Sequence, residues 1–329
     1  MINQDTYLNM HPKYTTRVIA PGRVNIIGEH VDYCKFPVLP MALDKVTTAD
    51  FVFKPDDSAE FKIYLTNKDP EKYPDFTIES FDPISNDPLT FFSKPIAWHH
   101  YVLAGFTCII QSQKSLPSGA LYVCFDSTVP PGAGLSSSSS VVVASAMILE
   151  QVYGQFLPKE RLAEKCAEYE RFVGMPGGGM DQAICILGQE NNASLIDFWP
   201  SLSQENVKLP AEAAMVVVHT GVEKHKAQSN DFSERVVSTR YAAKYLSNGK
   251  HTYLRECYEE IGDFDALKTA FEKTCPRGKQ KLKTLIDQFG KTVKVEDFNL
   301  DDELKVYDRG LHEIDDNKNL LFFFENQVF

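Results

Sequence analysis

Short apolar runs recur along the first 200 residues, and polar or glycine-containing segments separate them. Runs that alternate apolar and polar positions, or that are rich in β-branched residues, predict strands at residues 16–20, 45–53, 60–65, 75–79, 120–125 and 193–198. Apolar positions at helical spacing predict helices at residues 96–111, 137–153, 159–173 and 180–187. Gly174 directly follows the third of these helices, as is typical of a C-terminal stop.

The order of these elements favours an α+β fold over a repeating βαβ sheet, because strands come first and helices are then interleaved with strands. Pro200 and the polar residues 201–206 indicate a domain boundary. We therefore expect one domain over residues 1–205 and a second over residues 206–329.

The second part of the chain is less regular. Residues 214–220 predict a buried strand, and residues 231–246 predict a helix that ends at Asn248-Gly249. Beyond about residue 281 the chain is charged and less periodic, and it then carries the apolar run 319–324. An apolar end of this kind needs a partner surface, so we expect the second domain to be incomplete.

Composition limits the class of protein. The 329 residues are 43% hydrophobic and can bury a large core, and a formal net charge of −11 disfavours unspecific attraction to nucleic acid or to an anionic membrane. No stretch has the roughly 20 apolar residues that span a bilayer, and residues 1–11 lack the apolar segment of a signal peptide. We expect a soluble, cytoplasmic monomer.

The seven cysteines are odd in number and scattered, and no Cys-x-x-Cys occurs among them. This argues against a disulfide framework or a zinc site, so we interpret them as reduced thiols that mostly serve packing.

A glycine loop followed by a row of serines leads into an apolar helix. The loop begins at Pro131 and continues through Gly132, Ala133, Gly134, Leu135, Ser136, Ser137, Ser138, Ser139 and Ser140. The unpaired N–H groups at a helix start point at anionic oxygens, and serine adds donors and a possible Mg²⁺ ligand. This pattern predicts a polyphosphate site. A flexible serine-rich linker is the alternative, but a linker does not normally join a strand-like segment to a β-branched run.

Two further glycine-flanked segments carry charged groups. Between Gly22 and Asp32, the chain places Arg23, Glu29 and His30 close together after an apolar strand, as a site for sugar hydroxyls would require. A solvated turn with ordinary surface charges is the alternative.

The glycines at 177–179 deliver Asp181 to the start of a new helix. The helix dipole favours an anion there, so Asp181 is a candidate to accept a proton or orient a hydroxyl. A simple helix cap is the equal alternative.

Two other segments do not discriminate between the possible functions. Lys226 and Arg235 are either phosphate or sugar contacts or ordinary surface charges. Gly290-Lys291-Thr292 resembles the end of a Walker A loop, but Leu285 replaces the required earlier glycine. If a nucleotide binds, we expect it at residues 130–140.

The segments 21–33, 130–139 and 177–182, in that order and spacing, resemble the galactokinase branch of the GHMP small-molecule kinases. Within that branch, residues 32–42 and 176–182 are most similar to N-acetylgalactosamine kinase and the fungal galactokinases. The resemblance implies a two-domain fold whose N-terminal domain is like domain 2 of ribosomal protein S5. It also implies ATP-dependent phosphorylation of the C1 hydroxyl of N-acetylgalactosamine or galactose, with Mg²⁺.

The resemblance also assigns roles by position. Arg23 and Asp181 match the catalytic pair, and Glu29, His30, Asp32 and Gly178 match sugar contacts. The loop from Gly132 to Ser139 matches the ATP phosphate loop, and Ser138 and Glu170 match metal ligands. Trp98 matches an aromatic residue near adenine, although a core tryptophan is an equal interpretation. Phe232 stands where galactose-specific members usually carry tyrosine, which favours N-acetylgalactosamine.

One motif of the family is missing. No paired glycines follow Gly249, whereas the family has a third glycine-rich motif near its C-terminus. We therefore expect the chain to stop partway through the second domain. A sugar and ATP sensor without catalysis, and an inactive truncated product, remain the alternatives to a kinase.

Overall fold

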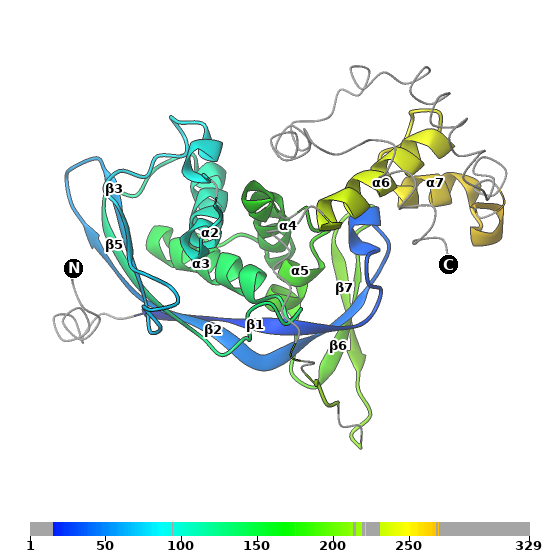
Figure 1. The fold of residues 1–329 in the computed structure, drawn as a ribbon, viewed down its shortest axis with the longest axis horizontal. Coiled ribbons are helices and arrows are strands. Elements are labelled where there is room, and N and C mark those ends of the chain that lie inside the picture. Colours follow the sequence, from blue (N-terminus) through cyan, green and yellow to red (C-terminus); the bar gives the residue numbers. More distant parts are fainter. Residues whose placement is uncertain are drawn as a thin grey trace.

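The computed structural model of the chain describes residues 16–93, 95–174, 176–212, 215–218, 221, 231–267 and 269. A five-stranded sheet is its frame (Figure 1). The strands are β1 (Thr16–Ile27), β2 (Leu39–Pro55), β3 (Phe61–Asn67), β4 (Phe76–Ile78) and β5 (Gly119–Ser127). Their order is β1-β2-β5-β3-β4, and the β3–β5 pair is parallel whereas the other neighbours are antiparallel.

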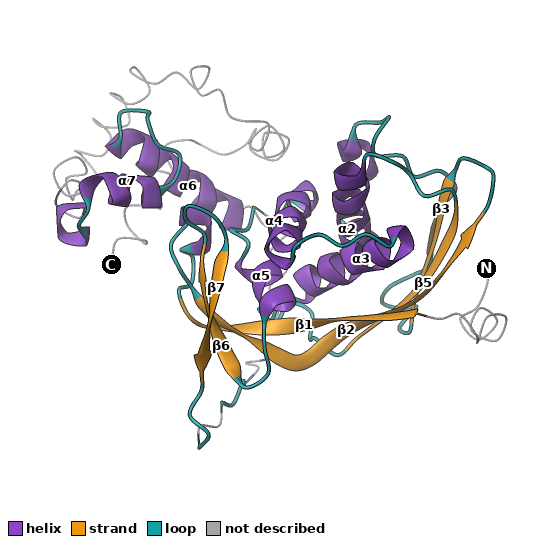
Figure 2. Cartoon of the chain, turned by 180° about the vertical axis from the view of Figure 1, so that it is seen from behind, coloured by secondary structure: helices purple, strands orange, loops and turns teal. Residues whose placement is uncertain are grey.

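Helices cover one face of this sheet, as Figures 1 and 2 show from opposite sides. They are α2 (Trp98–Gln113), α3 (Ser137–Tyr153), α4 (Lys159–Glu170) and α5 (Met180–Leu187). Alternation along the strands decides the face, because Phe51 of β2 is buried in the core while its neighbour Asp50 pairs with Arg17 on the other face. The core therefore lies between the sheet and the helices.

Helices α2 and α3 approach each other closely at Gly105. A Cβ atom at this position would lie 2.3 Å from the backbone oxygen of Val142 and 2.7 Å from Cβ of Ser145. Because only glycine leaves this space, α3 packs deeply onto α2, and its N-terminus takes a fixed position beside β1.

Beyond the sheet, strands β6 (Asn192–Asp197) and β7 (Ser203–Lys208) form an antiparallel hairpin. Ile196 of β6 also bridges to Val38, which ties the hairpin to the connection between β1 and β2. Three short 3-10 helices are η1 (Asp32–Cys34), η2 (Pro88–Phe91) and η3 (Arg171–Val173).

Helices α6 (Asp231–Leu246) and α7 (Leu254–Ile261) complete the described part of the chain. Helix α6 lies against η1, where Arg240 Nη1 donates to the Tyr33 carbonyl at 2.5 Å and Val236 joins Tyr33 and Cys34 in a small apolar cluster. This contact brings the start of α6 to the segment that follows β1.

The α+β expectation is confirmed, and the six strands predicted in the first 200 residues and all the predicted helices have a counterpart in the structure. The prediction of a buried strand at residues 214–220 is wrong where it can be compared. Residues 215–218 form no strand, and Val216 and Val218 are 81% and 77% exposed. An isolated apolar run gains a strand only by pairing, and no described strand pairs with it.

The polar segment 201–206 lies largely in β7 rather than in a linker, so the 205/206 division would cut a strand. The division into two domains stays a prediction. Residues 281–329, including the apolar run 319–324 and the Walker-like Gly290-Lys291-Thr292, lie outside the described residues, as does Lys226.

Six cysteines belong to the described residues, and all six are free thiols buried in the packing. Across the described ranges, no helix combines the length and apolar character that crossing a bilayer requires.

Candidate active site

Arg23 reaches the interior from an irregularity in β1. The pairing of β1 with β2 shifts register between Pro21 and Arg23, where one residue of β1 faces three residues of β2. At Gly22 the strand passes so close to the loop before α3 that a Cβ atom would lie 2.8 Å from the Leu135 carbonyl oxygen. The Arg23 N–H donates to that same oxygen at 3.0 Å. Strand β1 is therefore fixed to the loop, with Arg23 at the junction.

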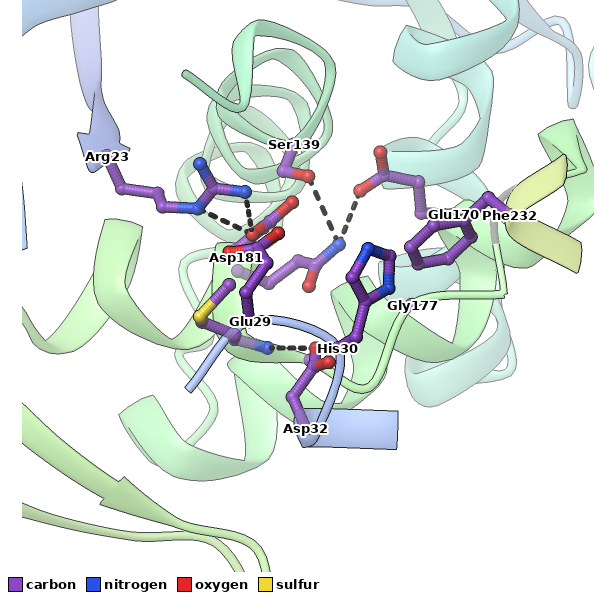
Figure 3. Close-up of a pocket in the computed structure, with 12 residues that line it drawn as sticks. Arg23, Glu29, His30, Asp32, Ser139, Glu170, Gly177, Asp181 and Phe232 are labelled. Atoms are coloured by element: carbon purple, nitrogen blue, oxygen red, sulfur yellow. Dashed lines mark hydrogen bonds and ion pairs between the residues drawn. The ribbon is translucent and has the colours of Figure 1, made fainter. Parts of the chain in front are cut away.

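The Arg23 guanidinium pairs with Asp181 in the first turn of α5. Its Nε donates to Asp181 Oδ1 at 2.7 Å and its Nη2 lies 2.7 Å from the same oxygen, as Figure 3 shows. The Arg23 side chain is 4% exposed, and that of Asp181 is 25% exposed. Burial opposes the charge on the guanidinium, but the Asp181 carboxylate outweighs it, so the pKa of Arg23 lies above its ordinary value.

The glycine loop before α3 has the shape of an anion site. Gly132, Gly134 and Ser136 take φ angles of 68°, 71° and 58°, and the turn leads directly into α3. The Gly134 carbonyl accepts a hydrogen bond from Arg23 Nη1 at 2.5 Å. The Ser136 hydroxyl is buried without a hydrogen-bond partner. An unpaired hydroxyl beside a helix N-terminus suits the oxygens of a phosphate.

Asp32 caps the helix that carries Asp181. Its Oδ2 accepts hydrogen bonds from the N–H groups of Gly178 at 3.0 Å and Met180 at 3.4 Å. Burial, helped by the nearby Asp181 charge, raises the pKa of Asp32, although the backbone donors act in the opposite direction. The N-cap residue of α5 is Gly179, which has no side chain. Asp181 is thus engaged by Arg23, and a carboxylate from a distant segment serves as the cap.

Gly178 lies against the backbone of η1. A Cβ atom there would be 2.1 Å from the carbonyl carbon of Asp32 and 2.1 Å from the Tyr33 nitrogen, so only glycine fits. Its neighbours Gly177 and Gly179 line the pocket. The Gly178 N–H group is already bound to Asp32. The sugar contact of Gly178 stays a prediction.

Three sugar-binding candidates, Glu29, His30 and Phe232, line the pocket together. His30 takes a φ of 63°, and its Nδ1 lies 3.0 Å from the Tyr33 hydroxyl. The Phe232 ring, from α6, lies 5.9 Å from the His30 ring and edge-on to Tyr33 at 5.7 Å. Glu29 is held by Asn25, whose Nδ2 donates to Glu29 Oε2 at 2.8 Å. Polar groups and one aromatic face therefore border the same opening (Figure 3).

Glu170 ends α4 and lines the same pocket. Burial, followed by the Asp181 charge, raises the pKa of Glu170 to about 7, while hydrogen bonds with Ser139, Gln182 and Ser138 lower it. One carboxylate beside serine hydroxyls is a suitable partial ligand set for Mg²⁺, which commonly completes its shell with substrate phosphates and water. Within the described ranges, no three His, Cys, Asp or Glu side chains gather as a metal cluster.

One pocket gathers eight of the predicted site residues. Its lining includes Arg23, Glu29, His30, Asp32, Ser139, Glu170, Asp181 and Phe232. The remaining residues of the glycine loop lie behind Arg23 and contact it through Leu135 and Gly134. Trp98 does not line this pocket, since its indole N–H donates to the Pro74 carbonyl at 3.0 Å and its rings pack on the core. Its contact with adenine stays a prediction.

Sequence reasoning missed Gln182 and Asn25. Gln182 binds Glu170 and Ser139 through one nitrogen, and Asn25 binds Glu29. Asn25 lies four residues before Glu29, a spacing that the sequence displays. The partners of Gln182 lie 12 and 43 residues away, and no local pattern points to them.

Comparisons with known proteins match two segments of this chain to family descriptions. Residues 2–50 match the galactokinase galactose-binding signature, and residues 100–189 match the GHMP kinases N terminal domain. The first match contains Arg23, Glu29, His30 and Asp32, and the second contains the glycine loop and Asp181.

Several galactokinases are similar in sequence over most of this chain. The Dictyostelium discoideum galactokinase is 36% identical over 231 residues, which are 69% of this chain and 45% of that protein. The Saccharomyces cerevisiae galactokinase is 32% identical over 255 residues, 72% of this chain and 47% of that protein. The chain thus spans about half the length of the curated relatives it matches.

The fold is that of a solved galactokinase. The crystal structure of Lactococcus lactis galactokinase complexed with galactose superimposes with a TM-score of 0.60 at 20% identity, covering 92% of this chain and 78% of that one. The two matched segments show that the chain contains a GHMP kinase N-terminal domain and the galactose-binding signature of galactokinases.

Proposed function

We propose that the chain acts as an ATP-dependent sugar kinase that phosphorylates the C1 hydroxyl of galactose or N-acetylgalactosamine. The observation that carries the proposal is the Arg23–Asp181 pair, which lines the pocket and is bonded to the phosphate loop at Gly134. Phosphoryl transfer needs positioning and neutralisation of charge more than covalent help from the protein. A carboxylate, a guanidinium and a helix start in contact supply both.

Each of the two residues has a distinct task in this reaction. The Asp181 carboxylate orients the sugar C1 hydroxyl and accepts its proton, while the hydroxyl oxygen attacks the γ-phosphorus. The bond from that phosphorus to the β–γ bridging oxygen breaks, and ADP leaves. Arg23, whose charge is buried, holds Asp181 in place and stabilises the negative charge on the transferring group.

The start of α3 is suited to hold the phosphates of ATP. Its first N–H groups have no intrahelical partners, and the buried Ser136 hydroxyl has none either. Binding of phosphate oxygens would satisfy both kinds of donor. The positive φ at Gly132 and Gly134 folds the loop around that position.

The charge balance of the pocket favours a nucleotide that arrives with a divalent cation. Four acidic side chains line it, Glu29, Asp32, Glu170 and Asp181, against the single guanidinium of Arg23. A tetra-anionic nucleotide entering alone would add repulsion. Glu170 and Ser138 are the residues that would hold Mg²⁺, which on binding neutralises charge on the phosphate oxygens.

Two observations bear on the choice of sugar. The matched signature is described as galactose-binding, and the similar proteins are named galactokinase, which support galactose. Phe232 lacks the hydroxyl that galactose-specific members usually place against the sugar. The Phe232 ring requires no hydrogen bond from the sugar and leaves an apolar surface against which an acetyl group can pack. This favours N-acetylgalactosamine.

The test is sugar-dependent ADP release from the chain, with Asp181→Asn compared with Asp50→Asn. Asp50 is a matched control because it also pairs with an arginine, Arg17, but on the outer face of the sheet. We expect Asp181→Asn to lower kcat by about 10²–10⁴-fold, as loss of a general base does, and Asp50→Asn to leave it unchanged. Tight binding of ATP and sugar without ADP release would refute the kinase and support the sensor.

A further inference from the structure

Gln182 joins three elements around the metal side of the pocket. Its side chain is buried, with 4% of the residue exposed, and it follows Asp181 in the first turn of α5. Its Nε2 donates to Glu170 Oε2 at 2.5 Å on α4 and lies 3.3 Å from Ser139 Oγ on α3, the two dashed lines that leave Ser139 and Glu170 in Figure 3. One amide therefore fixes the spacing between the carboxylate and the serine row.

The chemistry of Glu170 sets the orientation of this amide. When Glu170 is ionised its carboxylate only accepts hydrogen bonds, so the Gln182 nitrogen faces Glu170 and the oxygen points elsewhere. That oxygen, Oε1, is buried and has no hydrogen-bond partner. Leaving a buried acceptor unpaired costs about 1–3 kcal/mol, which a purely structural residue would avoid.

A ligand bound in the pocket is the candidate source of the missing donor. Gln182 is one of its lining residues, next to Glu170, Ser139 and Asp181. A donor that enters with the ligand can reach an acceptor in the wall, whereas no described protein group does so. The unpaired oxygen is the second observation, besides the Glu170 contact, that directs Gln182 toward a ligand.

We propose that Gln182 is a positioning residue for the divalent cation: its Nε2 holds the Glu170 carboxylate beside the serine row, and its Oε1 receives a hydrogen bond when the cation–nucleotide complex binds. This inference rests on the proposed function, in which Glu170 is a metal ligand. A group that orients a metal ligand typically changes metal affinity about 10–100-fold when it is removed.

The test measures Mn²⁺ binding in the presence of a non-hydrolysable ATP analogue, by the loss of the free Mn²⁺ signal in electron paramagnetic resonance. Gln182→Met keeps the length of the side chain and removes both polar atoms, and Gln189→Met makes the same change at an exposed position after α5. We expect Gln182→Met to weaken Mn²⁺ about 10–100-fold and Gln189→Met to leave it unchanged.

A double-mutant cycle separates positioning from a general structural role. If Gln182 acts through Glu170, adding Gln182→Met to Glu170→Gln weakens Mn²⁺ binding less than Gln182→Met does alone, because the carboxylate that Nε2 positions is already gone and only the Oε1 contact remains to be lost. Effects that multiply in the double variant would overturn the inference. Galactose affinity, measured by calorimetry without nucleotide, is expected to be the same in Gln182→Met and the wild type.

The same measurements separate this inference from the proposed function. If Glu170→Gln weakens Mn²⁺ and Gln182→Met does not, the inference about Gln182 is wrong and the kinase stands. If Glu170→Gln itself leaves Mn²⁺ binding unchanged, Glu170 is not a metal ligand, and the metal side of the proposed function fails together with the inference.

Discussion

Replacing Glu170 by glutamine removes the proton-binding group that burial perturbs most clearly at the pocket. Burial raises the pKa of Glu170 from 4.5 to about 7. Each tenfold change in proton affinity is worth about 1.4 kcal/mol, so the folded chain binds this proton more tightly than the unfolded chain by about 3 kcal/mol. The raised pKa means that the stabilisation is complete below pH 4.5 and is lost as the pH rises through 7.

Glu170→Gln mimics the protonated form at every pH. Its carbonyl oxygen still accepts the hydrogen bond from Gln182, so the packing at the end of α4 is kept. We therefore expect Glu170→Gln to raise the free energy of unfolding of the metal-free chain. This gain over the wild type is expected to be larger at pH 8 than at pH 5 by between about 2 and 3 kcal/mol.

The assay is urea unfolding of the wild type and Glu170→Gln at pH 5 and pH 8, with a chelator present so that no metal contributes. Glu168→Gln is the control, because it removes one carboxylate from the same helix at a site where the side chain is 48% exposed. If the free energy of unfolding changes equally between pH 5 and pH 8 in the two variants, the reasoning is refuted, because burial of Glu170 would then not be the cause of the pH dependence.

Three substitutions test other parts of the geometry. Gly105→Ala places a Cβ atom 2.3 Å from the Val142 carbonyl, so we expect a loss of about 1–3 kcal/mol in urea unfolding, and an unchanged midpoint would contradict the close approach of α2 and α3. Gly178→Ala pushes α5 away from Asp32, so we expect weaker sugar binding in calorimetry; wild-type affinity would contradict the role of that contact. Phe232→Tyr is expected to raise the kcat/KM for galactose relative to N-acetylgalactosamine, and an unchanged ratio would show that this ring does not select the sugar.

Local patterns predicted the segments that carry the chemistry. The glycine loop, the Arg23 segment and the Asp181 helix start are each encoded within about a dozen residues, because glycine and helix-start signals act over short distances. The structure brings Arg23, Asp181 and the loop together beside a register shift between β1 and β2. Nothing local predicts that shift, since it depends on how β2 pairs with β1.

Contacts between distant segments account for what the sequence did not predict. The sugar contact of Asp32 stays a prediction, but its cap on α5 was not predicted, because Gly178 and Met180 lie 146 and 148 residues away. Strand β7 looked like a polar linker because its positions are mostly exposed, and its backbone pairing with β6 leaves no apolar pattern. Both cases reflect partners that the sequence does not bring near one another.

Helix α5 explains how one short element serves both ends of the pocket. Successive residues on a helix point about 100° apart, so the neighbours Asp181 and Gln182 face different partners, Arg23 on β1 and Glu170 on α4. The helix is only eight residues long and is too short to be stable alone, so its position depends on the Asp32 cap and on the buried face that includes Ile184. Any change that displaces α5 must therefore disturb sugar activation and metal placement together, whereas Gln182→Met separates the two.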